Sequence, residues 1–280
     1  MSSLYYLAAL ILSAVVIVNA DGAARSYDAL YHKLTPSEKT ETVMQSWLET
    51  LTFGLYDGGT RRDARVKSLL ESAHSQASKA RVAGWVLAAV SAAFLGAGIL
   101  RARREAAERR VLARHLLGVA GIFLVIGLIA PVISLIAYRD VPVIGTAVVK
   151  YESRGILTAI TALLHSGNPV VAALLLLFSV VTPAAKLGLS FRAAGTHDGE
   201  RHRQAVRALR VIGNWSMTDV FVVAVLLALF VVGTDRATDA WPGIGLYFFA
   251  GYSILALAAG HLIARAGPVP KPPDGGGGAG

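Results

Sequence analysis

The stretch VAGWVLAAVSAAFLGAGIL, residues 82–100, decides the class of this protein. Its 19 residues carry no charged side chain, and they are long enough to cross a hydrocarbon layer of about 30 Å as an α-helix. Five further apolar runs flank it, at residues 4–18, 116–138, 169–190, 217–232 and 244–264. Since 54% of the 280 residues are hydrophobic and the mean hydropathy is +0.55, we expect an all-α membrane protein, a polytopic helical bundle with about six transmembrane helices.

The first apolar run leaves two alternatives open. Residues 1–20 form either a signal peptide, because Val18 and Ala20 occupy the positions that cleavage prefers, or an uncleaved signal anchor. At the other end of the chain, residues 266–280 are rich in Pro and Gly and are predicted to be a disordered cytoplasmic tail.

The net charge of +9 comes from arginines that gather in two segments. One holds Arg101, Arg103, Arg104, Arg109, Arg110 and Arg114, and the other holds Arg192, Arg201, Arg203, Arg207 and Arg210. The positive-inside rule places both on the cytoplasmic face, together with the C-terminus and, if the first run is uncleaved, the N-terminus. The basic surplus is then a topology signal, and no nucleic-acid partner is expected.

Residues 21–81 are predicted to form a small helical hairpin outside the cytoplasm. Thr35, Pro36 and Glu38 match a capping box with Pro at the first helical position, which starts one helix. A second helix begins near Arg61 and continues straight into the span at 82–100. Residues 82–114 therefore comprise a membrane helix and a basic cytoplasmic loop.

Two prolines and one amphipathic pattern mark the middle of the chain. Pro131 and Pro183 are each expected to kink the helix that contains them. Between these spans, Ile156, Ile160, Leu163 and Leu164 recur at helical spacing. This predicts an amphipathic helix, which either lies on the membrane and gathers lipid or packs onto the bundle.

Catalytic and cofactor motifs are not found in the sequence. The absence of Cys excludes disulfides, thiolate zinc sites, iron–sulfur clusters and cysteine nucleophiles. There is no nucleotide-binding loop, nucleophile elbow or zinc-protease motif. A cluster of His197, Asp198, Glu200 and His202 is interpreted as a solvated loop, because neighbouring arginines would repel a cation. We expect neither enzymatic activity nor a cofactor or metal.

Charged residues within the apolar runs point to function, because a charge at membrane depth is costly unless it is paired. Lys186 and Asp219 lie at similar depth on sequentially adjacent runs and are predicted to pair. In the alternative interpretation, Lys186 reaches the headgroups and Asp219 is favoured by the helix dipole. Ser179, Thr182 and Pro183 lie on the same run as Lys186.

Three stretches resemble a known family. NWSMTDVF, residues 214–221, is similar to the Trp-Ser-Met-x-Asp-Val-Phe signature of the paraquat-inducible protein A family. FSVVTPAAKLGL, residues 178–189, resembles the Pro-x-x-Lys segment that precedes this signature, and residues 155–169 resemble the loop between the spans. The resemblance covers residues 115–265, about one four-helix module. The matching signature residues are Trp215, Ser216, Met217, Asp219, Phe221 and Pro183.

The resemblance implies a role in the bacterial inner membrane. Members of the family work beside mammalian-cell-entry (MCE) domain proteins, which form periplasmic lipid tunnels, so phospholipid and an MCE-domain protein are the expected partners. The polar network of the module would comprise Lys186, Asp219, Thr182, Ser179 and Ser216. Better-known members carry two modules and cysteine-rich zinc-binding segments. Here the exported hairpin or a second copy of the chain would replace the missing module. A non-transporting scaffold or an envelope stress-response protein is the alternative function.

Overall fold

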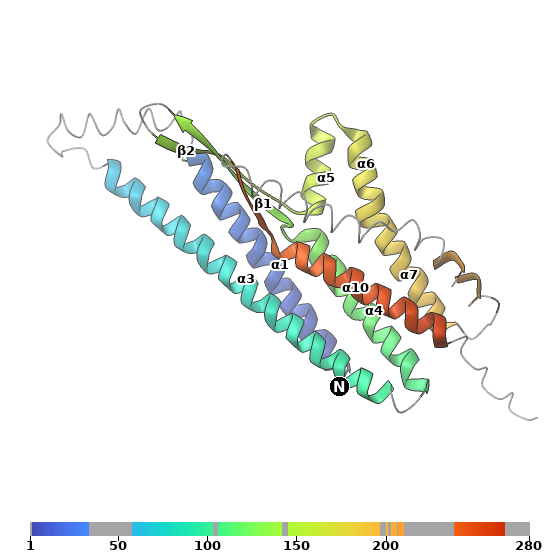
Figure 1. The fold of residues 1–280 in the computed structure, drawn as a ribbon. Helices are drawn as coiled ribbons and strands as arrows, with labels where there is room; N and C mark the ends of the chain where they lie inside the picture. The colour runs from blue at the N-terminus through green and yellow to red at the C-terminus, as the bar shows by residue number, and fades with distance from the viewer. Residues whose placement is uncertain are drawn as a thin grey trace, which may run out of the picture.

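The structure is a bundle of long helices with a small sheet at one end (Figure 1). It is a computed structural model that describes residues 2–33, 58–102, 106–141, 145–196, 200, 203–205, 207–209 and 238–266. Within these residues, five helical stretches are long and apolar enough to cross a membrane: Ser2–Tyr27, Glu71–Ala102, Glu108–Ile129, Pro169–Gly195 and Ile244–Arg265. The predicted all-α polytopic class is therefore confirmed. The fifth predicted run, residues 217–232, lies outside the described residues.

The two ends of the bundle differ in character. One end carries the three strands and the start of α10, and we call it the sheet end (Figure 1). The opposite end carries the start of α4 and the ends of α3, α7 and α10, and we call it the arginine end. Exposed arginines gather there, at Arg101, Arg109, Arg114, Arg192 and Arg265. The basic segment between α3 and α4 is shorter than predicted, because α3 ends at Ala102 and α4 begins at Ala106, so Arg109 and Arg114 lie on helix α4.

Helices α1, Ser2–Lys33, and α3, Gly58–Ala102, lie side by side and run in opposite directions (Figure 1). Helix α3 runs without a break from Gly58 through the span at 82–100, as predicted for the helix that begins near Arg61. Small side chains at Ala20, Ala23 and Ala80 are buried in this pair, which allows the two backbones to approach closely. The helix expected after Thr35 lies outside the described residues, as does the tail from residue 267.

Helix α4, Ala106–Ile129, packs against this pair. The Tyr5 hydroxyl and Ser91 Oγ are hydrogen-bonded at 2.8 Å. The Tyr6 hydroxyl lies 3.1 Å from Nδ1 of His115 on α4, and Phe94 stacks on Tyr5 with ring centroids 4.0 Å apart. Polar groups buried in a bilayer need partners within the protein, and these two bonds provide them for Tyr5 and Tyr6.

The third apolar run is shorter as a helix than expected. The sequence predicted a span over residues 116–138, whereas α4 ends at Ile129 and strand β1 begins at Ile133. Pro131 explains the difference, because a residue that lacks an N–H and clashes with the preceding turn ends a helix here rather than kinking it. The apolar residues after Pro131 belong to a sheet that was not predicted.

The sheet joins three strands in the order β2-β1-β3. The strands are β1, Ile133–Val141, β2, Gly145–Arg154, and β3, Thr238–Pro242. Both pairings are antiparallel, and Ile133 pairs with Arg154 on one side and with Pro242 on the other. The sheet therefore connects the segment after α4 with the segment before α10.

Three glycines allow the chain to converge at the end of α4. The N–H of Gly243 donates to the Val132 carbonyl at 2.9 Å, and the N–H of Gly245 donates to the Pro131 carbonyl at 2.8 Å. A Cβ on Gly243 would collide with the Pro131 carbonyl, and one on Gly155 would lie 2.8 Å from the Ile129 carbonyl oxygen. We call this meeting point of residues 129–132, 155 and 243–245 the glycine junction. It fixes the start of three elements, β1, α5 and α10.

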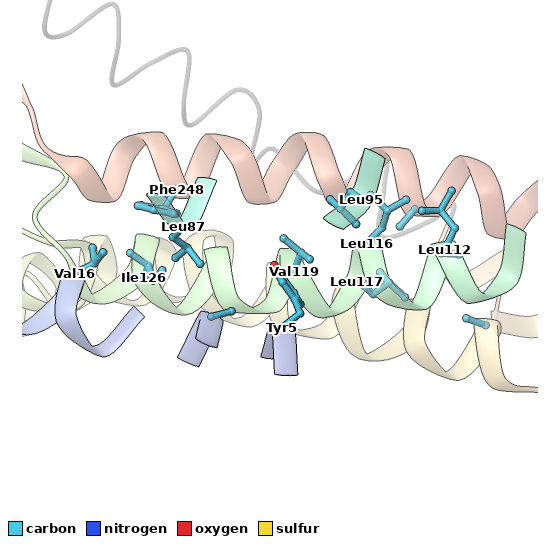
Figure 2. Close-up of a cluster of buried hydrophobic side chains, with 14 of the residues drawn as sticks. Tyr5, Val16, Leu87, Leu95, Leu112, Leu116, Leu117, Val119, Ile126 and Phe248 are labelled. Carbon is cyan, nitrogen blue, oxygen red and sulfur yellow. The ribbon is translucent and has the colours of Figure 1, made fainter. Parts of the chain in front are cut away.

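Helix α10, Ile244–Ala266, packs along α4. The two backbones approach closely at Gly127, where a Cβ would lie 2.8 Å from the backbone nitrogen of Phe249. Phe248, Leu87 and Ile126 join the core that this packing shares with α1 and α3 (Figure 2). Spans α1, α3, α4 and α10 are thus one packed unit.

Candidate functional site

The fourth span contains an irregular turn where its predicted polar residues lie. It consists of α6, Pro169–Leu176, a π-helical turn η1, Leu177–Val181, and α7, Thr182–Gly195. The Leu177 carbonyl accepts hydrogen bonds from the backbone N–H of Thr182 and from its Oγ1, the latter at 2.8 Å. Pro183 follows directly and cannot donate a backbone bond. Single π-turns inside α-helices are often found at functional sites.

A hydrogen bond from Tyr252 connects this turn with the neighbouring helix α10. The Tyr252 hydroxyl donates to the Pro183 carbonyl at 2.9 Å, and the tyrosine is only 1% exposed. The bond is buried within the bundle. It fixes the relative height of α7 and α10, and it satisfies a carbonyl next to the irregular turn.

Ser179 is the unusual member of this group. It lies in η1, it is 1% exposed, and its Oγ has no hydrogen-bond partner among the described residues. A buried polar atom without a partner costs about 1–3 kcal/mol. We define the span site as buried Ser179, Pro183 and Tyr252 together with partly exposed Thr182.

The comparisons with known proteins place this site within a recognised region. The model of the family described as "Paraquat-inducible protein A" matches residues 127–266, half of the chain. The chain belongs to the paraquat-inducible protein A family. The family region begins in the last turn of α4 and includes the sheet, the whole fourth span and α10. Helices α1 and α3 lie before it.

Curated relatives in this family are similar over a shorter stretch. The chain is 34% identical over 101 residues to the "Intermembrane transport protein PqiA" of Escherichia coli K12, and equally so to the proteins of the same name from E. coli O6:H1 and Shigella flexneri. The alignment covers 34% of this chain and 24% of each relative, so the chain matches about a quarter of the relatives' length. No solved structure matches the chain.

The structure brings together part of the polar network that the family resemblance implied. Ser179, Thr182 and Pro183 share one segment of the fourth span, and half-buried Lys186 lies one turn further along α7. Asp219, Ser216 and the other signature residues, Trp215, Met217 and Phe221, lie outside the described residues. The predicted Lys186–Asp219 pair is therefore not tested. Of the loop cluster at 197–202, Glu200 alone is described, and it is exposed.

Sequence reasoning missed Tyr252. Its hydroxyl is the one polar group that α10 contributes to the span site, but a tyrosine in an apolar run is equally common as a packing residue. The predicted kink at Pro183 did locate the irregular segment. The partner of the Pro183 carbonyl depends on a contact across 69 residues, and no local pattern encodes it.

Proposed function

We propose that this chain is a non-enzymatic protein of the bacterial inner membrane that takes part in moving phospholipid across the cell envelope, together with an MCE-domain protein. The observation that carries the proposal is the position of the span site. The buried polar groups of Ser179 and Tyr252 lie at a π-turn in the region that matches the family model, and relatives in this family are named for intermembrane transport.

The physical character of the bundle supports this role. Most of the fourth span faces outward with apolar side chains, including Val181 and Leu177, while Ser179 is turned inward. A lipid has the same two parts, with apolar chains and a polar head. The exposed apolar residues of this span are suited to contact acyl chains. The unsatisfied hydroxyl inside is suited to a polar headgroup.

The first test is recovery of partners from membranes. The full-length protein is purified in mild detergent, its phospholipid is extracted and quantified, and associated proteins are identified by mass spectrometry. We expect bound phospholipid and an MCE-domain protein, in amounts above those found with an unrelated multi-pass protein. If neither is recovered, the transport role is wrong and the scaffold alternative replaces it.

The second test asks whether the span site takes part. Ser179→Ala removes the unsatisfied hydroxyl, and Ser190→Ala is the matched control because Ser190 is a buried serine on the same span. We expect Ser179→Ala to reduce lipid transfer between membranes by about tenfold, equivalent to ~1.4 kcal/mol, with no loss of folded protein. Equal transfer by both variants would remove the span site from the mechanism.

A charge exchange separates transport from a purely structural role. In a scaffold, Lys186→Asp combined with Asp219→Lys restores the pair and all function with it. In a transport protein, the exchanged pair restores the bundle, measured by its thermal midpoint in detergent, but leaves lipid transfer impaired.

A further inference from the structure

The hairpin formed by α5, Ile156–His165, and α6 projects beyond the end of α4 at the sheet end (Figure 1). The two helices are joined by a short turn in which Gly167 has a φ of +78°. From residue 155 to residue 185 the chain contains no Asp, Glu, Lys or Arg, a run of 31 residues. About 20 residues suffice to cross a bilayer, so the uncharged run extends well beyond one crossing.

One face of α5 packs against the bundle. Ile156 and Ile160 are buried and belong to a core with Val132, Phe249 and Ala172. The predicted helix is confirmed, and Ile156 and Ile160 of its predicted stripe are buried, whereas Leu164 is exposed. Packing onto the bundle therefore accounts for the apolar residues on one face of α5. It does not account for the apolar residues that are exposed on the other face.

The outward surface of the hairpin exposes large apolar side chains beside its polar ones. Leu164 is 52% exposed and Val170 is 70% exposed, and both flank the turn at the tip. The exposed apolar surface continues without a charge along α6, η1 and α7, through Val171, Leu174, Leu177 and Val181. The surface of the tip is thus continuous with the surface that the fourth span presents to lipid.

The polar side chains of the hairpin bond to the hairpin itself. Thr158 Oγ1 accepts from the Gly155 N–H at 2.8 Å and donates to the Gly155 carbonyl at 3.0 Å, and Thr161 Oγ1 donates to the Thr158 carbonyl at 2.9 Å. At the tip, His165 Nδ1 lies 2.7 Å from the Thr161 carbonyl oxygen, and Ser166 Oγ donates to the Leu163 carbonyl at 3.0 Å. Side chains that satisfy themselves locally need no water, as is required in lipid.

The height of the hairpin sets where this surface lies. Arg114 Nη2 donates to the Ala194 carbonyl at 3.2 Å, which aligns α4 with the end of α7 at the arginine end. From Ala194 back to Pro169 at the tip, the fourth span covers 25 helical steps and rises about 38 Å. The tip therefore stands about 38 Å above the arginine end, whereas the hydrocarbon core measures about 30 Å.

We propose that the α5–α6 tip contacts phospholipid acyl chains at the bilayer surface on the sheet end and just beyond it. A lipid bound there would lie farther out of the bilayer than its neighbours in the same leaflet. A water-exposed loop at this height would carry charges or free polar groups. At this tip the exposed polar residues His165, Ser166 and Asn168 make hydrogen bonds within the hairpin. Leu164 and Val170, which flank them, continue the lipid-facing surface. That the lipid bound at the tip is the one transferred rests on the proposed function, whereas contact between the tip and acyl chains does not.

The contact can be measured with single cysteines, because the chain contains none of its own. Leu164→Cys and Val170→Cys are labelled with an environment-sensitive fluorophore in the full-length protein, reconstituted into phosphatidylethanolamine and phosphatidylglycerol vesicles. Val181→Cys reports a lipid-facing position, and Ser75→Cys, on an exposed part of α3, reports a water-facing one. Quenching is compared between lipids brominated on their acyl chains and aqueous iodide.

We expect both tip probes to lose most of their fluorescence to brominated lipid, as Val181→Cys does, and to be protected from iodide. Tip probes that behave like Ser75→Cys would overturn the proposal. Disulfide-linked dimers formed through Leu164→Cys, without quenching by brominated lipid, would also overturn it by showing that a second copy covers the tip.

A second measurement connects the tip with transfer. Val170→Asp places a charge at the tip, and Ser75→Asp is the control on α3. We expect Val170→Asp to abolish quenching of the Leu164→Cys probe and to lower lipid transfer, with the thermal midpoint unchanged. Lost acyl contact with normal transfer would refute the role of the tip in transfer. If wild-type protein shows acyl contact but carries no phospholipid, the proposed function fails and the contact stands.

Discussion

Two interfaces of α4 are built by different means. Toward α1, the contacts are made by the far ends of side chains, such as the Tyr6 hydroxyl, which lies where a Cβ on Gly118 would come within 2.5 Å. Toward α10 and the sheet, they are made by backbone, at Gly127 and at the glycine junction. A side-chain end can move aside, whereas backbone held by hydrogen bonds cannot. We therefore expect the family region to tolerate substitution less than the interface with α1.

The largest effect is expected at the glycine junction. In Gly243→Ala the new methyl group would collide with the Pro131 carbonyl, and relief requires the start of α10 to move away from Val132. We expect a loss of about 3 kcal/mol or more, seen as a missing monodisperse peak in detergent chromatography. Gly260→Ala on the same helix is the control, since nothing lies within 4 Å of its Cβ position. Normal yield of Gly243→Ala would show that the junction is not a constraint.

A smaller effect is expected where α4 and α10 cross. In Gly127→Ala the added Cβ would lie 2.8 Å from the Phe249 nitrogen, and the two helices must separate slightly. Overpacking of this kind typically costs about 1–3 kcal/mol. The thermal midpoint in detergent should fall while the protein still folds. A midpoint equal to that of wild type would contradict the close approach of the two helices.

The polar contact between α1 and α3 should be weaker again. A double-mutant cycle of Tyr5→Phe and Ser91→Ala isolates the 2.8 Å hydrogen bond between their hydroxyls. Such bonds within membranes contribute about 0.6 kcal/mol on average and at most about 1.7 kcal/mol. Additive effects of the two single variants on stability in detergent would mean that the bond contributes nothing.

A comparably small effect is expected at Gly118. Its Cβ would meet only the end of the Tyr6 side chain, which can rotate away at the cost of its contact with His115. We expect Gly118→Ala to change stability by about 1 kcal/mol or less, and less than Gly127→Ala in the same assay. A reversed order of these two variants would refute the contrast between the interfaces.

The spans were predictable and the sheet was not, for reasons that individual residues illustrate. Uncharged runs such as 82–100 mark membrane helices whatever their neighbours are. Residues 133–138 continue the apolar run of α4 in composition, so Pro131 was the single local signal that the helix ends there. The pairing of Ile133 with Pro242 joins positions more than 100 residues apart, and no local periodicity encodes such a pairing.

The candidate site, like the fold, was predictable only where local sequence signals mark it. Pro183 and the neighbouring hydroxyl residues indicated an irregular segment in the fourth span, because proline and buried serine are both unusual in an apolar helix. The π-turn itself and the bond from Tyr252 follow from how α7 and α10 pack. The α5 helix was predicted from the spacing of Ile156 and Ile160, but the direction in which it stands depends on the glycine junction.

The central position of β1 has a consequence for how the protein is made. Strand β2 follows β1 directly, but 96 residues separate Val141 from Thr238. At a synthesis rate of about 5–20 residues per second, one edge of β1 waits roughly 5–20 s for its second neighbour. An open strand edge invites pairing with other chains. The newborn protein therefore passes through an interval in which its half-built sheet needs a chaperone or rapid insertion of the last helix to escape aggregation.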